Sequence, residues 1–331
     1  MTRKELQSVL EELSEYQQNQ LSQTAMLYHS LNQELADIEP KSCPCCKDQN
    51  TRFIRKGYLR GKQRFQCKSC GRKFTYDSKQ LTSNSHQPVE SWLIVLEDTL
   101  SLKSLNSTAK RIGVCHSTAF HLRHKLLVYM EEVVAASAPL EALIETDETY
   151  LLESQKGTKV TNRKPRRHGE SSGKRGLSNE QMCVCVATDR ANHVVARCVN
   201  RAKPSSEDLV EALASHIAGK SVLLCDGAAS YNLLAEITDC QKVSLVGHEA
   251  YNKLYHLNTV NSLHSRFKEM MRKLRGVASK YLNRYAALFS ILAMNVNRSA
   301  SEATDHLRCA LRPLRVAITI NSANSLYILE F

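Results

Sequence analysis

The sequence contains no run of about 18 consecutive apolar residues, the length that a membrane-spanning helix requires. Its first stretch, MTRKELQSVLEELSEYQQ, is too acidic and polar for a secretory signal peptide. We therefore expect no membrane association and a place in the reducing cytoplasm. Low-complexity segments and a fixed repeat period are also absent, which excludes collagen-like, disordered and repeat architectures.

Acidic residues are fewer than basic ones in this chain of 331 residues. Lys plus Arg number 45 and Asp plus Glu number 33, so the formal charge is +12. A surplus of this size indicates a polyanionic partner, most simply a nucleic acid. Hydrophobic residues make up 42% of the chain, which is enough for a buried core. At about 100–200 residues per domain, the length predicts two or three domains.

Shifts in composition divide the chain into segments. Gly and Pro are absent before Pro40, and the Leu-, Glu- and Gln-rich start predicts a helical N-terminal arm. That arm is used in dimerisation, or it packs on the chain's own domain. A Cys-rich basic segment, a helical segment, a mixed strand and helix region and a tail follow. The predicted boundaries are 1–39, 40–76, 90–135, 140–300 and 301–331.

Cysteine is frequent, with 12 residues, and a reducing compartment disfavours disulfide bonds among them. Two knuckles, Cys43-x-x-Cys46 and Cys67-x-x-Cys70, are separated by 20 residues, a spacing at which four thiolates form a tetrahedral zinc site. A segment with so few apolar residues needs such a metal to fold. We therefore predict a zinc ribbon with structural Zn²⁺. Cys45 is an alternative ligand, and four reduced core cysteines are the competing interpretation.

Two stretches are strongly basic. Nine Lys and Arg residues lie between Arg52 and Lys73 with no acidic residue among them. Beside the predicted zinc site they favour contact with a DNA backbone over a merely solvated surface. The polar loop 155–179 carries eight Lys and Arg against Glu170 alone. We expect this loop to clamp phosphates, the alternative being a disordered basic linker.

A helix-turn-helix is predicted within the helical segment. Apolar residues recur at helical spacing from Leu102 to Ile112, Gly113 interrupts them, and Ser117 is a candidate cap for a second helix. In this arrangement the second helix enters the DNA major groove. An ordinary helical hairpin explains the pattern equally well. The polar groups available on the second helix are His116, His121, Arg123, His124 and Lys125.

Two aspartates follow apolar runs in the 140–300 segment. Asp147 lies in the predicted strand 142–151, and Asp226 ends the predicted strand 221–227. Groups at the strand ends of an α/β sheet converge, and Mg²⁺ would neutralise two carboxylates held close together. Such a site could activate an attacking oxygen and stabilise the leaving oxygen of a phosphodiester. Taken singly, each aspartate is more simply explained as a turn or cap residue.

A hairpin over 182–199 and a capped helix over 205–219 are also predicted.

A long helix is predicted from His256 to Arg275. It carries an apolar stripe that faces the sheet and a polar stripe at the same spacing. On the polar stripe, Asn261 could ligate a metal through its carbonyl, and Lys268 could hold a substrate phosphate. The alternative is a solvated basic face. The polar stripe consists of Asn258, Asn261, Ser265, Lys268 and Arg272.

Together these features resemble a known family. The ribbon, the helical segment, Asp-Glu-Thr-Tyr after a strand, Leu-Cys-Asp-Gly before a helix, and His-Leu-Asn-x-x-Asn-x-x-His-Ser-x-Phe-Lys are similar to bacterial insertion-sequence transposases of the ISXO-like branch. The resemblance covers about residues 40–300. It implies an α/β fold class: an RNase H-like catalytic domain, which is a mixed sheet with flanking helices, preceded by a zinc ribbon and a small helical DNA-binding segment.

The resemblance also implies the site residues. Asp147, Asp226 and Asn261 take the positions of the Mg²⁺ (or Mn²⁺) ligands, and Lys268 takes the position of the lysine that follows them. Glu is usual at the third position, although the branch includes members with Asn. We expect Asn261 to weaken binding of the second metal, because it removes one negative charge from the site. Glu148 points to the opposite face of the strand from Asp147 and ranks below it.

The predicted function is a DNA transposase that cleaves the ends of an insertion-sequence element and joins them to target DNA by two-metal phosphoryl transfer. Joining two ends implies a homodimer or a higher assembly, in the cytoplasm and associated with the nucleoid. Two alternatives stay open. One is a non-catalytic zinc-ribbon DNA-binding regulator derived from a transposase, and the other is an RNase H-like nuclease that cuts without joining.

Overall fold

The computed structural model describes residues 40, 43–46, 51–59, 62–75, 85–87, 89–157, 173, 176–246 and 254–295. The chain divides into two compact units, the first ending at Leu93 and the second beginning at Ile94. The predicted N-terminal arm, the tail 301–331 and most of the basic loop 155–179 lie outside the described residues. Across the ranges that are described, every helix is too short or too polar to cross a membrane.

The first unit contains a three-stranded antiparallel sheet in the order β1-β2-β3. Its strands are β1 (Phe53–Leu59), β2 (Lys62–Cys67) and β3 (Lys73–Thr75). The strands are short, and nearly all side chains of β1 are exposed.

The core of this small sheet consists of a few side chains. Cys43, Phe65, Cys67 and Phe74 are buried, and Phe53 packs edge-on against Phe74 with ring centroids 5.6 Å apart. A core of this size stabilises a fold weakly unless a metal or another cross-link supplements it. The sequence-based expectation that this segment needs a metal therefore fits its packing.

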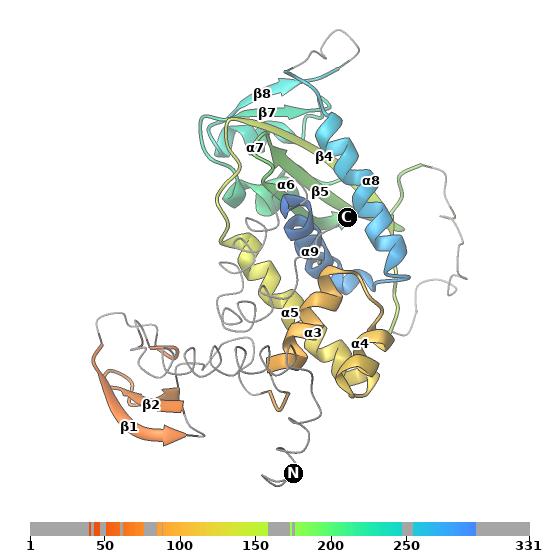
Figure 1. Cartoon of the computed structure of the whole chain (residues 1–331). Helices are drawn as coiled ribbons and strands as arrows, with labels where there is room; N and C mark the ends of the chain where they lie inside the picture. The colour runs from red at the N-terminus through yellow and green to blue at the C-terminus, as the bar shows by residue number, and fades with distance from the viewer. Residues whose placement is uncertain are drawn as a thin grey trace, which may run out of the picture. The chain divides into compact units, whose positions relative to one another are not determined.

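Three helices precede the large sheet of the second unit, and the boundary between the units falls within the first of them (Figure 1). They are α3 (Val89–Leu100), α4 (Leu105–Ile112) and α5 (His116–Ala135). The predicted helix, turn and helix are present, since Gly113 ends α4 and α5 begins three residues later. Two details differ from the prediction. Leu102 lies outside α4 with φ of 53°, and the cap of α5 is Cys115 rather than Ser117.

Two side chains predicted to be available to DNA are buried instead. Arg123 donates to Thr108 Oγ1 at 2.9 Å, which ties α5 to α4. The His124 ring lies 4.1 Å from that of Phe120 and 4.3 Å from that of Tyr281, so it is enclosed by aromatic groups. The sequence did not reveal this because α5 packs against α4 and also against α9, a helix more than 150 residues later. Of the five polar groups predicted to be available, His116, His121 and Lys125 are exposed.

The second unit is built on a five-stranded mixed sheet in the order β6-β5-β4-β7-β8 (Figure 1). β4 pairs antiparallel with β5 and parallel with β7. β5 and β6 form the predicted hairpin, and β8 pairs parallel with β7. The strands are β4 (Leu143–Leu152), β5 (Gln181–Asp189), β6 (Val194–Arg201), β7 (Val222–Cys225) and β8 (Gln241–Ser244).

Helices cover both faces of this sheet. On one face, Ile144 and its neighbours form a hydrophobic core with α6 (Ser206–Leu213) and α7 (Tyr231–Ile237). On the other face, α8 (Asn258–Lys273) packs against β4 and β5. Side chains alternate between the faces of a strand, so Glu145, which contacts α8, is opposite to Ile144. A mixed sheet in this order with flanking helices confirms the predicted RNase H-like α/β class.

The last described helix, α9 (Leu282–Asn295), covers the edge of the sheet at β6. Asn283 Oδ1 accepts a hydrogen bond from the backbone N–H of Cys198 at 2.7 Å, and Ser290 Oγ accepts one from that of Ala196 at 3.0 Å. These backbone groups point away from β5 and would otherwise lack a partner. Figure 1 shows α9 with α5 on one side and α8 on the other.

Candidate active site and metal centre

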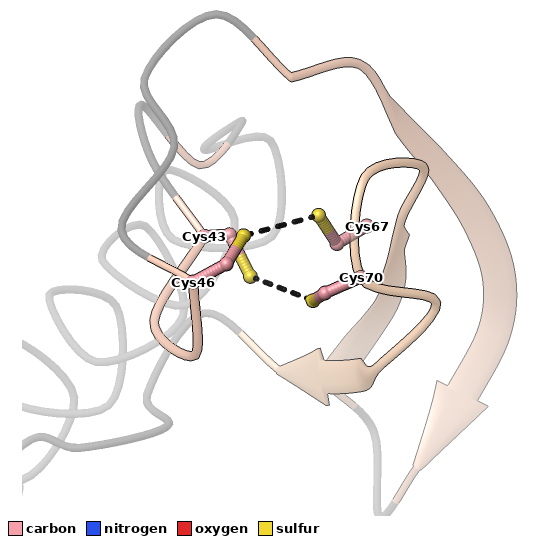
Figure 2. Close-up of side chains that lie close together, drawn as sticks. All are labelled: Cys43, Cys46, Cys67 and Cys70. Carbon is pink, nitrogen blue, oxygen red and sulfur yellow. Dashed lines mark hydrogen bonds between the residues drawn. The ribbon is translucent and has the colours of Figure 1, made fainter.

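The sulfur atoms of Cys43, Cys46, Cys67 and Cys70 converge in the first unit (Figure 2). All four lie within 4.8 Å of one another, with 3.6 Å between the sulfurs of Cys43 and Cys70 and 3.8 Å between those of Cys46 and Cys67. Among the described residues, this is the one group of three or more His, Cys, Asp or Glu side chains close enough to share an ion. Cys45 is exposed and lies outside the group, so it is not an alternative ligand in this conformation.

The surroundings of two of these thiols, Cys67 and Cys43, favour the thiolate. At Cys70, the backbone N–H of Arg72 lowers the pKa, but burial and the neighbouring Cys43 and Cys67 thiols outweigh it and the pKa is raised. A hydrogen bond with the Thr51 hydroxyl, 3.3 Å away, is the main cause that lowers the pKa of Cys67 to about 6. Burial acts to raise the pKa of Cys43, but hydrogen bonds from backbone N–H groups, including that of Cys45, outweigh it and the pKa is lowered. Thiolate is the form that ligates a metal. Four soft sulfur donors at this spacing fit a tetrahedral ion such as Zn²⁺.

Asp147, midway along β4, is level with Asp226, which directly follows the C-terminal end of the parallel strand β7. β4 and β7 pair with Glu145 opposite Leu224, so Asp147 and Asp226, each two residues further on, are level with one another. Asp147 is about a quarter exposed, and Asp226 is open to solvent. The two carboxylates that the sequence predicted to converge therefore do so.

The electrostatics of this pair suit a cation. Burial raises the pKa of Asp147, and the negative charge of Asp226 raises it further. The ammonium group of Lys268, on α8, acts in the opposite direction and lowers it. A divalent cation between two such carboxylates would relieve their mutual repulsion. Lys268 is thus close enough to Asp147 for their charges to interact across the strand and the helix.

A tight turn fixes Asp226 at the end of β7. Its Oδ1 accepts a hydrogen bond from the backbone N–H of Ala228 at 3.0 Å. Gly227 has φ of +92°, and a Cβ atom at this position would lie 2.6 Å from Cγ2 of Val246. Any side chain here would clash as well as strain the backbone. Glycine is required so that the aspartate can stand at the very end of the strand.

Glu148 points to the other face of β4, as predicted. It interacts with the hydroxyl of Tyr231, on α7, whereas its neighbour Asp147 faces α8. Burial raises the pKa of Glu148, and the charges of Asp147 and Asp226 add to this rise. Its Oε1 is buried without a hydrogen-bond partner in the part of the chain that the structure describes.

The polar stripe predicted on the long helix is present on α8. Its five side chains are all exposed, while Val260, Leu263, Phe267 and Met270 are buried against the rest of the unit. Asn261 and Lys268 lie two turns apart on this stripe. Within the described ranges, no hydrogen bond joins Asn261 to either aspartate. The structure therefore brings Lys268 to the carboxylate pair and leaves Asn261 on the adjacent exposed surface of the helix.

Glu145 is the main residue of this region that sequence reasoning missed. It is 1% exposed and lies two residues before Asp147, on the same face of β4. Its carboxylate accepts from Thr259 Oγ1 at 2.8 Å and from the backbone N–H of Val260 at 3.0 Å, and it pairs with the Arg190 guanidinium. This single side chain anchors the first turn of α8, which carries Asn261 and Lys268. Strand alternation could have placed it on the α8 face.

His264 is a second residue whose role the sequence did not reveal. Its Nδ1 lies 3.8 Å from Oδ2 of Asp147, and its ring is buried between α8 and β4. Burial, together with the charge of Lys268, lowers its pKa to about 4, so the ring is neutral near pH 7. The Nε2 atom has no hydrogen-bond partner within the described ranges. A neutral imidazole beside Asp147 packs the helix onto the strand without adding charge to the site.

Comparison with known families and proteins identifies relatives of this unit. Residues 139–290 match the family model described as the ISXO2-like transposase domain. A protein of Halobacterium salinarum described as an uncharacterized protein in transposable element ISH50 is 27% identical over 255 residues. The matched stretch is 75% of this chain and 84% of that protein.

Solved structures show only a weak likeness. The simian T-cell lymphotropic virus intasome in complex with the PP2A regulatory subunit B56 gamma matches 62% of this chain and 71% of its own, at 9% identity and a TM-score of 0.31. The Mos1 strand transfer complex matches 70% of this chain and 78% of its own, at 10% identity and a TM-score of 0.29. Scores this low carry no argument about this chain.

Proposed function

We propose that this chain, whose residues 139–290 match the ISXO2-like transposase domain model, cleaves the ends of a DNA element and joins them to target DNA. The family match and the relative in a transposable element support a transposase. The observation that carries the catalytic proposal is the juxtaposition of Asp147, midway along β4, with Asp226, at the end of β7. Repulsion between two carboxylates, one of them partly buried, is unfavourable without a cation and is typical of a cation-binding site.

In this proposal, Asp147, Asp226 and Asn261 hold Mg²⁺, and Lys268 binds the phosphate that is cut. Bound Mg²⁺ supplies a Lewis acid that favours deprotonation of the attacking oxygen and neutralises the leaving oxygen. In the first step, water attacks the phosphorus, the P–O3′ bond breaks, and a free 3′-hydroxyl is released. In the second step, that hydroxyl attacks a phosphodiester of the target, and the target strand leaves with its own 3′-hydroxyl. Neither step needs a protein nucleophile.

The remaining segments bind DNA in this proposal. The ribbon, residues 40–76, holds Zn²⁺ through Cys43, Cys46, Cys67 and Cys70 and contacts the DNA backbone with its basic side chains. The segment 90–135 presents His116, His121 and Lys125 to DNA, while 140–300 is the catalytic domain. The loop 155–179 clamps phosphates. Two element ends must meet before they are joined, so the working form is a dimer or a higher assembly.

A strand-transfer assay tests the proposal. Full-length protein is mixed with DNA that carries the sequences flanking its own gene, a plasmid target, and Mg²⁺ or Mn²⁺. Asp226→Asn removes one carboxylate of the pair. Asp239→Asn is the matched control, because Asp239 is exposed in a turn with φ of 52°, a conformation that Asn adopts readily.

Each outcome separates one function from the others. Joined product from the wild type and from Asp239→Asn, but not from Asp226→Asn, supports a transposase. Nicks without joining, again lost in Asp226→Asn, would indicate an RNase H-like nuclease. Specific DNA binding without cleavage, equal in all three proteins, would indicate a DNA-binding regulator.

A further inference from the structure

A groove opens beside the carboxylate pair, on the same face of β4. It lies between the end of β4, α8 and the segment that joins α8 to α9, and its volume is about 600 Å³. Leu151 is four residues after Asp147, so at about 3.3 Å per residue the wall of the groove formed by Leu151 lies roughly 13 Å from that aspartate. Lys268, whose charge acts on Asp147, also lines the groove. Lys268 therefore belongs both to the lining of the groove and to the surroundings of the carboxylate pair.

The lining of the groove combines apolar and cationic groups. Leu151, Leu152, Met271 and Val277 present aliphatic side chains, and Lys268 and Arg272 add positive charge from α8. Lys156 adds a further cation, since its Nζ lies 4.0 Å from the position of a Cβ on Gly276, a groove residue. Among the residues that the structure describes, no acidic side chain lines the groove. Apolar walls beside cations are complementary to a nucleotide, which has an aromatic base and an anionic phosphate.

The groove is held open by the backbone. Ser154, after β4, and Ser279, before α9, exchange two hydrogen bonds: the Ser154 N–H donates to Ser279 Oγ at 2.9 Å, and the Ser279 N–H donates to the Ser154 carbonyl at 2.8 Å. Gly276 adopts φ of +99°, which allows the chain to turn sharply at the end of α8. The two walls are thus joined before any ligand arrives. A preformed groove binds its ligand at a lower entropic cost.

The volume decides what size of ligand enters. About 600 Å³ lies in the range of small-molecule sites, roughly 300–1,000 Å³, and is far too small for a duplex. A single nucleotide taken out of the stack fits this range. Enzymes that do chemistry on a DNA base extrude the nucleotide in this way and hold the base between aromatic or apolar side chains.

We propose that this groove binds one unstacked nucleotide of the DNA strand next to the phosphate that is cut. The base lies against Leu151, Leu152, Met271 and Val277, and its phosphate lies beside Arg272. This inference rests on the proposed function, since it needs DNA at the carboxylate pair. The distance of about 13 Å corresponds to roughly four nucleotide steps of 3.4 Å, so the extruded nucleotide is within four positions of the cut.

The test is a scan with 2-aminopurine, a base whose fluorescence rises when it leaves the stack. It replaces each of the four nucleotides on either side of the cut in turn, and the full-length protein is added without a divalent cation so that the strand stays intact. Leu152→Glu places a negative charge in the groove at a partly exposed strand end. Arg272→Gln removes the proposed phosphate contact. Lys273→Gln is the matched control, because Lys273 is the next residue of α8 and pairs at the surface with Glu269.

We expect the fluorescence to rise at one position with the wild type and with Lys273→Gln. The rise is lost with Leu152→Glu and with Arg272→Gln, and Arg272→Gln lowers the slope of log affinity against log salt by about 1. Circular dichroism melting of each variant excludes unfolding as the cause of the loss. In joining assays, we expect Leu152→Glu and Arg272→Gln to react more slowly than the wild type, and Lys273→Gln to react at the wild-type rate.

Other results would overturn the inference. If the wild type joins DNA but raises fluorescence at no position, the groove inference is wrong and the transposase proposal stands. If the rise survives both groove variants, the base is unstacked elsewhere and the groove is not its site. If the wild type neither cuts nor joins any DNA, the proposed function fails, and the inference that rests on it is rejected with it.

Discussion

The Glu145 carboxylate accepts a hydrogen bond of 3.0 Å from the backbone N–H of Val260, across 115 residues of sequence. Val260 lies in the first turn of α8, where backbone N–H groups have no partner within the helix. A buried carboxylate at this position also interacts favourably with the helix dipole. Glu145 therefore links the strand that carries Asp147 to the first turn of the helix that carries Lys268.

Replacing Glu145 with Gln is expected to weaken this anchor. The variant keeps the size of the side chain but loses the charge that pairs with Arg190 and strengthens the bonds from Thr259 and Val260. We expect the free energy of unfolding to fall by about 2–3 kcal/mol, the scale of a lost charge-assisted hydrogen bond. Denaturant titration measures this, and Glu236→Gln, at an exposed site on α7, serves as the control. Equal stability of the two variants would contradict the anchoring role.

The cysteine group is expected to bind metal through four specific thiols. Changing Cys46 to Ser should abolish the visible absorption of tetrahedral Co²⁺ substituted into the protein and should unfold the small sheet, since its core is minimal. Cys45→Ser is the matched control and should leave the spectrum unchanged, because Cys45 lies outside the group. If the two variants give the same spectrum, the assignment of the ligands is wrong.

Replacing Asn261 with Glu is expected to lower the Mg²⁺ concentration that supports half-maximal cleavage, because it adds a third carboxylate to the proposed metal site. Ser262→Glu places the same charge on the same turn of α8, rotated away from Asn261, and should not change that concentration. The measurement is a Mg²⁺ titration of cleavage for the three proteins. Unchanged metal dependence in Asn261→Glu would refute a ligand role for this residue.

His124 is expected to make the protein less stable in acid. Burial, and then the positive charge of Arg284, lower its pKa from 6.5 to about 4. The folded state thus binds the proton more weakly than the unfolded state, so the stabilisation is present above pH 6.5 and is lost as the pH falls toward 4. At about 1.4 kcal/mol per pKa unit, the loss attributable to His124 is about 2–3 kcal/mol near pH 4.

Thermal melts between pH 7 and pH 4 measure this loss. His124→Gln should flatten the decline in Tm with falling pH, although His264 will preserve part of it, since its pKa is also lowered to about 4. His116→Gln, at an exposed position on the same helix, should keep the full decline. An identical pH profile in the two variants would show that burial of His124 is not responsible.

The strands and the long helix were predictable from local patterns. Runs of apolar and β-favouring residues predicted β4, β5 and β6, and two stripes at helical spacing predicted α8. Ser205 and Asp208 form the capping box that the sequence indicated at the start of α6. By contrast, α7 and β8 have seven and four residues, too few for a periodic pattern to stand out.

The parts that escaped prediction depend on contacts distant in sequence. Arg123 and His124 looked available to DNA because their burial is caused partly by α9, which follows about 150 residues later. The sequence did not distinguish Glu145 from the other acidic residues, because its hydrogen-bond partners on α8 lie more than 110 residues away. A local sequence pattern predicts the face of a strand on which a side chain lies. The residues that contact it on that face are known only from the folded structure.

The covering of β6 by α9 has a consequence for incomplete copies of the gene. A polypeptide that stopped before Leu282 would lack Asn283 and Ser290, so the backbone N–H groups of Cys198 and Ala196 would be open to pairing. An open strand edge recruits other chains and promotes aggregation. Prematurely terminated products would therefore precipitate or be degraded, and they would not compete with the full-length protein.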